Sequence, residues 1–88
     1  MVTKLENDLI TAEIDSYGAE LTSLKLKDEN LDYLWSGDPD FWGRQSPILF
    51  PIVGKVKDNT YTVEGKEYTL KQHGFARNCD YELITNND

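Results

Sequence analysis

The chain has 88 residues, of which sixteen are acidic and nine basic, and its net charge is −7. This length allows one small domain, and the acidic balance without a run of lysines or arginines argues against a nucleic-acid partner. No apolar run approaches the roughly 18 residues of a membrane-spanning helix, so we expect no membrane partner. The single Cys79 cannot form an internal disulfide and the N-terminus lacks an apolar signal core, which predicts a cytoplasmic location.

The first third of the chain alternates apolar and polar residues with the period of two that is typical of strands. The pattern predicts three strands, over residues 9–14, 19–27 and 31–35. Leu21 is out of phase with Leu24, which predicts a bulge near Thr22 or Ser23. We therefore expect an antiparallel β-meander in this part of the chain.

The rest of the chain also reads as strands and loops. Residues 36–43 are rich in Gly, Pro and Asp and should form a loop, whereas residues 48–53 form an apolar run that we expect to be buried. Pro51 removes a ladder donor and should make that run irregular. Residues 59–70 predict a hairpin with a glycine at its tip, and residues 81–85 predict a final strand. Because no segment has a helical apolar period, we expect an all-β fold.

Two segments carry polar groups that a purely structural strand would not need. Arg44 lies just before the apolar run, and His73 and Arg77 lie together further along the chain. If the segments meet, they form a cationic pocket, and the guanidinium fork suits vicinal hydroxyls, carboxylates and phosphates. Taken singly, each arginine could instead be an ordinary ion-pair residue, and the histidine is as readily structural as functional. One histidine, with the only cysteine six residues away and no second histidine, does not make a metal site, so we expect no metal.

Three aromatic residues border the first of these segments. Phe41 and Trp42 lie in the expected loop, where their rings could stack on a sugar ring, although packing in a core is an equally good interpretation. For Trp35 the core is the better interpretation. Cys79 is expected to be a small buried hydrophobe.

In their order and spacing these motifs resemble the N-terminal part of the aldose 1-epimerase, or galactose mutarotase-like, family. The resemblance rests on Arg-Gln-Ser-Pro-Ile-Leu-Phe-Pro at residues 44–51 and His-Gly-Phe-Ala-Arg at residues 73–77, with the hairpin between them. The most similar members are the bacterial mutarotase-related branch and the hexose-6-phosphate mutarotases.

The resemblance implies a β-supersandwich and the interconversion of sugar anomers without a metal or an organic cofactor. By motif, Arg44, His73 and Arg77 correspond to substrate-binding residues, and His73 could also assist catalysis near the ring oxygen. We therefore expect residues 1–88 to be the N-terminal portion of a single mutarotase-like β-sandwich domain that acts on a hexose or hexose phosphate.

The resemblance is incomplete in one respect. The acid histidine and base glutamate of the family lie downstream of the motif at residues 73–77, beyond Asp88, so we expect a fragment that is inactive alone. Self-association through uncovered sheet faces is a further expectation. The alternative hypothesis is a non-catalytic carbohydrate-binding or interaction module.

Overall fold

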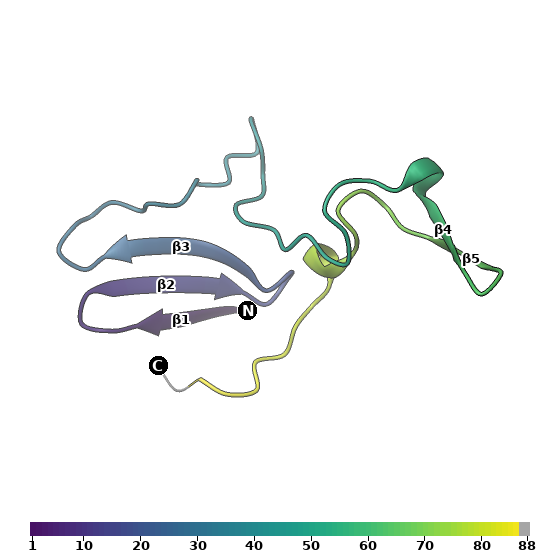
Figure 1. Cartoon of the computed structure of the whole chain (residues 1–88). Coiled ribbons are helices and arrows are strands. Elements are labelled where there is room, and N and C mark those ends of the chain that lie inside the picture. The colour runs from purple at the N-terminus through teal and green to yellow at the C-terminus, as the bar shows by residue number, and fades with distance from the viewer. Residues whose placement is uncertain (87–88) are drawn as a thin grey trace.

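The fold is built from antiparallel strands, and the computed structural model describes residues 1–86 (Figure 1). The elements, in chain order, are β1 (Val2–Glu6), β2 (Ile10–Asp15), β3 (Glu20–Leu26), the 3-10 turn η1 (Lys57–Asn59), β4 (Thr60–Val63), β5 (Lys66–Thr69) and the 3-10 turn η2 (Ala76–Asn78). The first three strands form one sheet in the order β1-β2-β3, and β4 and β5 form a separate hairpin. The expected all-β class is confirmed.

The meander has three strands, as expected, but one of them is different. β2 and β3 match two predicted strands, whereas the third member is β1. The sequence pattern of β1 is weak. Thr3 and Leu5 are its half-buried positions, and Leu5 is the one large apolar residue of the two.

The sheet has one apolar and one polar face, because residues paired directly across antiparallel strands share a face. Leu5 pairs with Ala12, which pairs with Leu24, so these residues form an apolar row. On the other face, Asp15 pairs with Glu20, and Glu13 pairs with Ser23. Glu20 and Ser23 are nevertheless buried, with 5% and 7% of their surface exposed.

The predicted bulge is confirmed at Thr22. Glu13 pairs with Ser23 and Ile14 pairs with Leu21, so Thr22 is the extra residue of β3. Its hydroxyl donates a hydrogen bond to the carbonyl of Glu13, 3.3 Å away. The bulge brings Leu21 back into phase with the apolar face.

Residues 31–35 do not form a strand, because the side chain of Asp32 takes backbone donors that a ladder would use. Its carboxylate accepts the N–H groups of Leu24 and Leu34 at 3.0 Å each and the hydroxyl of Ser23 at 2.6 Å. The N–H groups of Leu24 and Leu34, with the hydroxyl of Ser23, hold the pKa of Asp32 below its ordinary value. The chain therefore follows the edge of β3 through side-chain bonds and one isolated bridge, between Lys25 and Asp32.

Two further expectations are wrong in this structure. Residues 48–53 are irregular, as expected, but not buried, since Phe50 is 60% and Val53 74% exposed. Residues 81–85 are exposed and join no strand ladder within residues 1–86. In both segments the apolar side chains have too few neighbours among residues 1–86 to be covered, so their sequence pattern is not matched by packing.

The hairpin is confirmed in detail. Val63 pairs with Lys66, and the two residues between them, Glu64 and Gly65, have φ angles of 51° and 80°. Positive φ at both central positions is the requirement of a two-residue type I′ turn. The rings of Tyr61 and Tyr68 stack across the strands with centroids 5.3 Å apart, and Figure 1 shows the hairpin as an arm extending away from the sheet.

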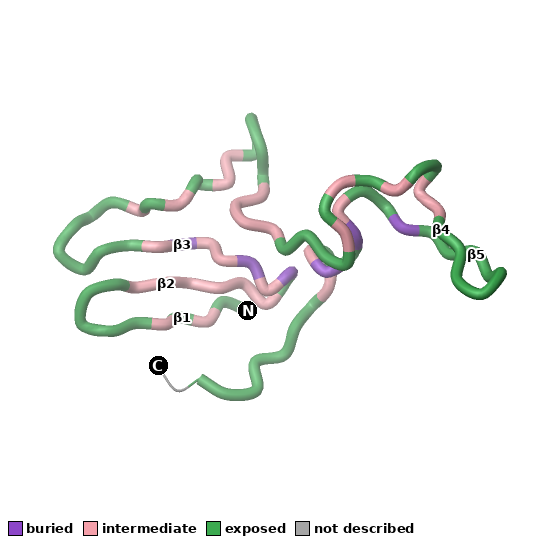
Figure 2. The backbone as a smooth tube through the Cα atoms, viewed as in Figure 1, coloured by how far each residue is buried: buried purple, intermediate pink, exposed green. Residues whose placement is uncertain are grey.

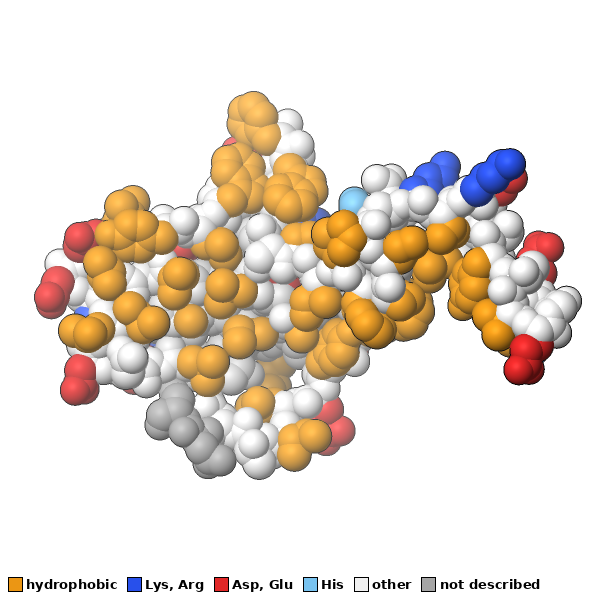
Figure 3. Space-filling model, in the orientation of Figure 1, with side chains coloured by type: hydrophobic (Ala, Val, Ile, Leu, Met, Phe, Trp, Pro, Cys, Tyr) orange, Lys and Arg blue, Asp and Glu red, His pale blue; other side chains and the backbone are white. Residues whose placement is uncertain are grey.

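The molecule is open rather than compact. It measures 55 × 34 × 18 Å with a radius of gyration of 16.6 Å, against about 12 Å for a compact chain of this length. It exposes 6853 Å², whereas a compact protein of its mass exposes about 5,300 Å². Among the described apolar residues, Leu70 and Ala76 are buried. Figure 2 shows that buried stretches of the backbone are few and short, and Figure 3 shows that hydrophobic side chains cover much of the visible surface. Apolar packing within the chain therefore holds little of the fold.

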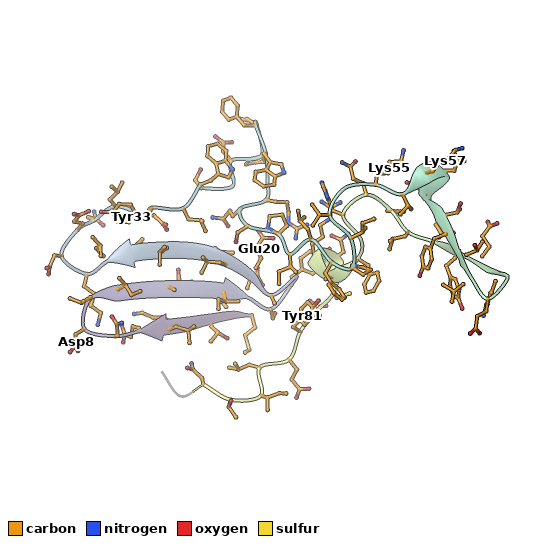
Figure 4. The ribbon with its side chains drawn as sticks, in the orientation of Figure 1. Asp8, Glu20, Tyr33, Lys55, Lys57 and Tyr81 are labelled. Atoms are coloured by element: carbon orange, nitrogen blue, oxygen red, sulfur yellow. The ribbon has the colours of Figure 1, made fainter. Side chains whose placement is uncertain are left out.

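Replacing Asp32 with alanine should destabilise the chain by about 1–2 kcal/mol, because the amides of Leu24 and Leu34 and the hydroxyl of Ser23 lose their acceptor. Urea denaturation followed by far-ultraviolet circular dichroism measures the change. Asp8→Ala, in the exposed β1–β2 turn (Figure 4), is the matched control. Equal stability of the two variants would contradict the role given to Asp32.

Candidate functional site

The two polar segments of the sequence lie side by side. Phe50 and Gly74 form a parallel bridge, and the carbonyl of Phe50 accepts the N–H groups of Phe75 and Ala76 at 3.0 and 3.1 Å. Gly74 has a φ of 73°, and a Cβ there would collide with the backbone of Phe50, so glycine makes this approach possible. The meeting of the segments, on which the predicted pocket depends, is thus present.

Glu20 is the centre of the junction between these segments and the sheet (Figure 4). One carboxylate oxygen accepts Arg44 Nε at 2.9 Å and Nη2 at 2.7 Å. The other oxygen accepts the N–H of Gln45 at 2.8 Å and that of Ser46 at 3.4 Å. A carboxylate on the polar face of β3 thereby holds the start of the apolar run.

The environment of Glu20 favours its charged form. Burial opposes ionisation, but the Gln45 N–H and the Arg44 guanidinium together outweigh it, so the pKa of Glu20 lies below its ordinary value. Glu20 is therefore charged at neutral pH, and it forms a forked, charge-assisted pair with the guanidinium of Arg44.

Arg44 also reaches the second segment. Its Nη2 donates to the carbonyl of Arg77 at 2.7 Å and its Nη1 to Asn78 Oδ1 at 3.3 Å. The guanidinium lies over the ring of Tyr17, 5.7 Å from its centroid. The structure thus brings the backbone of Arg77 to Arg44, although Arg77 is 33 residues later in the sequence.

His73 and the side chain of Arg77 have hydrogen-bond partners of their own. Arg77 Nη2 donates to the carbonyl of Gln72 at 3.2 Å, and its Nε is buried without a hydrogen-bond partner among residues 1–86. His73 Nδ1 accepts the N–H of Gly54 at 3.0 Å. In the neutral imidazole the proton is then on Nε2, which lies 3.5 Å from Nε2 of Gln72.

The aromatic residues form a separate projection. The rings of Trp35 and Phe41 meet edge to face with centroids 6.3 Å apart, and Trp35 Nε1 donates to the carbonyl of Trp42 at 2.8 Å. Phe41 is 81%, Trp42 51% and Trp35 42% exposed, so the interpretation of Trp35 as a core residue is wrong here. Within residues 1–86, no ring contact joins this projection to His73.

Sequence reasoning missed Glu20, the residue that joins the most groups at the site. Its position at the start of a strand with apolar alternation looks like an ordinary solvent-facing acid. A usable signal is the bulge at Thr22, since it places Glu20 in phase with Ser23 rather than with the leucines.

Cys79 is partly buried, and its thiol lies 3.4 Å from the carbonyl of Phe75.

Among residues 1–86, no cluster of three or more His, Cys, Asp or Glu side chains could hold a metal ion. No helix in the same residues is long and apolar enough to cross a membrane.

The sequence matches the family model for aldose 1-epimerase over residues 1–88, and the chain belongs to that family. The plasmid-encoded protein LacX of Lactococcus lactis is 38% identical over 88 residues, an alignment that covers 94% of this chain and 29% of LacX. Our chain therefore spans about three tenths of the length of the curated relatives that it matches.

Solved structures agree with the family assignment. A galactose mutarotase related enzyme from Lactobacillus acidophilus has a TM-score of 0.94 and 44% identity, with 99% of this chain and 29% of that chain covered. A galactose mutarotase-like protein from Lactobacillus casei has a TM-score of 0.93 and 42% identity, with 100% of this chain and 30% of that chain covered. The galactose mutarotase-like fold expected from the sequence is confirmed.

The lowered pKa of Glu20 predicts a loss of stability in acid. A carboxyl whose folded pKa is lowered stabilises the fold above its ordinary value of 4.5, and this contribution is lost as the pH falls through the lowered pKa. Glu20→Gln should cost about 2 kcal/mol at neutral pH, and its penalty should shrink below pH 4.5. Urea midpoints on both sides of that pH measure the effect.

The control for this prediction is Glu67→Gln, a change at an exposed position of β5. The control should unfold like the wild type at every pH. A Glu20→Gln penalty that stays constant with pH would show that the carboxylate charge is not what stabilises the junction.

Proposed function

We propose that residues 1–88 provide one wall of the sugar site of an isomerase that interconverts the anomers of a hexose or hexose phosphate. The observation that carries the proposal is the junction that brings Arg44, the turn containing Arg77 and the segment of His73 together, within a chain of the aldose 1-epimerase family. Guanidinium and imidazole donors suit the hydroxyl and phosphate oxygens of such a substrate. The exposed rings of Phe41 and Trp42 are proposed as stacking surfaces for the sugar.

Anomer exchange needs two proton transfers. A general base removes the proton of the anomeric hydroxyl and a general acid protonates the ring oxygen, after which the ring opens, C1 rotates and the steps reverse. His73 is proposed to bind or polarise the sugar near the ring oxygen, since its Nε2 can donate while Gly54 holds Nδ1. The proposed acid histidine and base glutamate lie in the part of the relatives that this chain does not span.

A phosphorylated sugar is supported by two lysines. Gly54 is tied to His73 by two hydrogen bonds, and Lys55 is the next residue in the chain; Figure 4 shows Lys55 on the loop before η1 and Lys57 at η1. The four ion pairs among residues 1–86 involve the N-terminus, Lys4, Lys27 and Arg44, so both lysines keep their charge available there. In an acidic chain this local positive charge suits a phosphate group.

We propose the cytoplasm as the location.

The 88-residue chain alone should not accelerate mutarotation, because the proposed proton-transfer groups are outside it. Polarimetry of freshly dissolved α-glucose, and of α-glucose 6-phosphate, should give the same rate with the chain as with buffer. Saturable acceleration that disappears in His73→Ala would overturn this part of the proposal and assign catalysis to the chain itself.

Titration with glucose and with glucose 6-phosphate, followed by backbone NMR shifts, distinguishes the alternative. One wall of a site should bind weakly, with small shifts centred on His73 and Arg77 and larger ones for the phosphate ester. A self-sufficient carbohydrate-binding module should bind tightly, and an interaction module should show no sugar-dependent shift at either residue.

We also propose that the chain self-associates through the apolar face of its sheet. The surface that it exposes beyond that of a compact protein is comparable to the area of a standard protein interface. Ile10 and Leu26 are paired on that face and are each 37% exposed. Burial of these side chains against a second copy would remove apolar surface from water.

Sedimentation velocity should show a mass that rises with concentration. Replacing both Ile10 and Leu26 with threonine, which keeps β propensity, should shift association to at least several-fold higher concentration. Val63→Thr, on the hairpin, is the control and should behave like the wild type. A monomer at all concentrations would refute the proposal.

A further inference from the structure

The donors of Arg44 are directed into the protein. Nε and Nη2 bind Glu20, Nη2 also binds the carbonyl of Arg77, and Nη1 binds Asn78. Four of the five N–H groups that a guanidinium carries are thereby engaged. The side chain is 26% exposed, so a ligand would have to displace these bonds to use the fork.

The bonds of Arg44 fix the turn that carries Arg77. The carbonyl of Arg77 and the side chain of Asn78 belong to η2, and Arg44 holds both. The β2–β3 turn holds the same segment from the sheet side, since the Gly18 N–H donates to the carbonyl of Cys79 at 2.6 Å. The position of the Arg77 backbone therefore depends on Glu20 through Arg44.

We propose that Glu20 and Arg44 are positioning residues: the buried carboxylate holds Arg44, and Arg44 holds the η2 turn so that Arg77 faces the substrate. Arg44 then acts through Arg77, which differs from the direct substrate contact that the family resemblance implies. This inference rests on the proposed sugar site, in which Arg77 is the residue that binds the ligand.

Gly18 lies at the contact between the β2–β3 turn and the η2 turn. Its φ is 74°, and a Cβ there would lie 2.5 Å from the carbonyl oxygen of Arg77 and 3.2 Å from Arg44 Nη2. Because a real Cβ does not come that close to backbone, Gly18→Ala must move the β2–β3 turn and the η2 turn apart without removing any charge. Gly65 has a similar φ of 80° with no atom within 4 Å of its Cβ position, so Gly65→Ala imposes the backbone strain alone.

The first experiment needs no ligand. In ¹⁵N spectra of the 88-residue chain, Gly18→Ala and Arg44→Lys should both shift the amide signals of Arg77 and Asn78, because lysine keeps the charge but loses the fork. Gly65→Ala should leave those signals unchanged. If neither Gly18→Ala nor Arg44→Lys moves them in a chain whose other signals stay dispersed, the positioning role is wrong.

The second experiment separates positioning from direct contact. We expect Arg44→Lys to weaken the binding of glucose 6-phosphate about tenfold in the wild-type background and to have no further effect in an Arg77→Ala background. Additive losses would mean that Arg44 contacts the ligand itself and would overturn the inference. If the wild-type chain does not bind glucose 6-phosphate, the proposed function fails, and the ligand-free spectra still decide the positioning role.

Discussion

The ion pair between Glu20 and Arg44 is the interaction on which the rest of the structure depends. Glu20 belongs to the first sheet, Arg44 begins the apolar run, and the carbonyl that Arg44 binds belongs to the segment of His73 and Arg77. Three parts of the chain that are distant in sequence meet at one guanidinium. The candidate site exists because a polar junction, rather than a shared apolar core, holds these parts together.

This arrangement explains why an open chain can have a defined site. Charge-assisted hydrogen bonds are directional, so a few of them fix a geometry that apolar contacts would fix only by close packing. The cost is that much apolar surface remains exposed, including the side chains of residues 48–53. The chain also spans 29% of the length of plasmid-encoded LacX and of the Lactobacillus acidophilus structure.

Sequence reasoning predicted the elements whose signals are local. The turn at Gly65 and the bulge at Thr22 follow from residue type and phase, and both are present. Sequence reasoning failed where a contact with a distant part of the chain decides whether a segment forms a strand. Residues 31–35 and 81–85 alternate like strands, but Asp32 occupies the donors of the first and the second has no ladder in residues 1–86. Glu20 was missed because burial of an acid is visible only once its partner is known.

Residue-resolved hydrogen exchange of the 88-residue chain tests the central claim most directly. The N–H groups of Gln45 and Gly18 are bound at the junction, whereas the hairpin is an arm outside it. We predict that the amides of Gln45 and Gly18 exchange more slowly than those of Tyr61 and Tyr68, a hydrogen-bonded pair of the hairpin. A hairpin that is protected while Gln45 and Gly18 exchange freely would contradict the claim that the Glu20–Arg44 junction organises this protein.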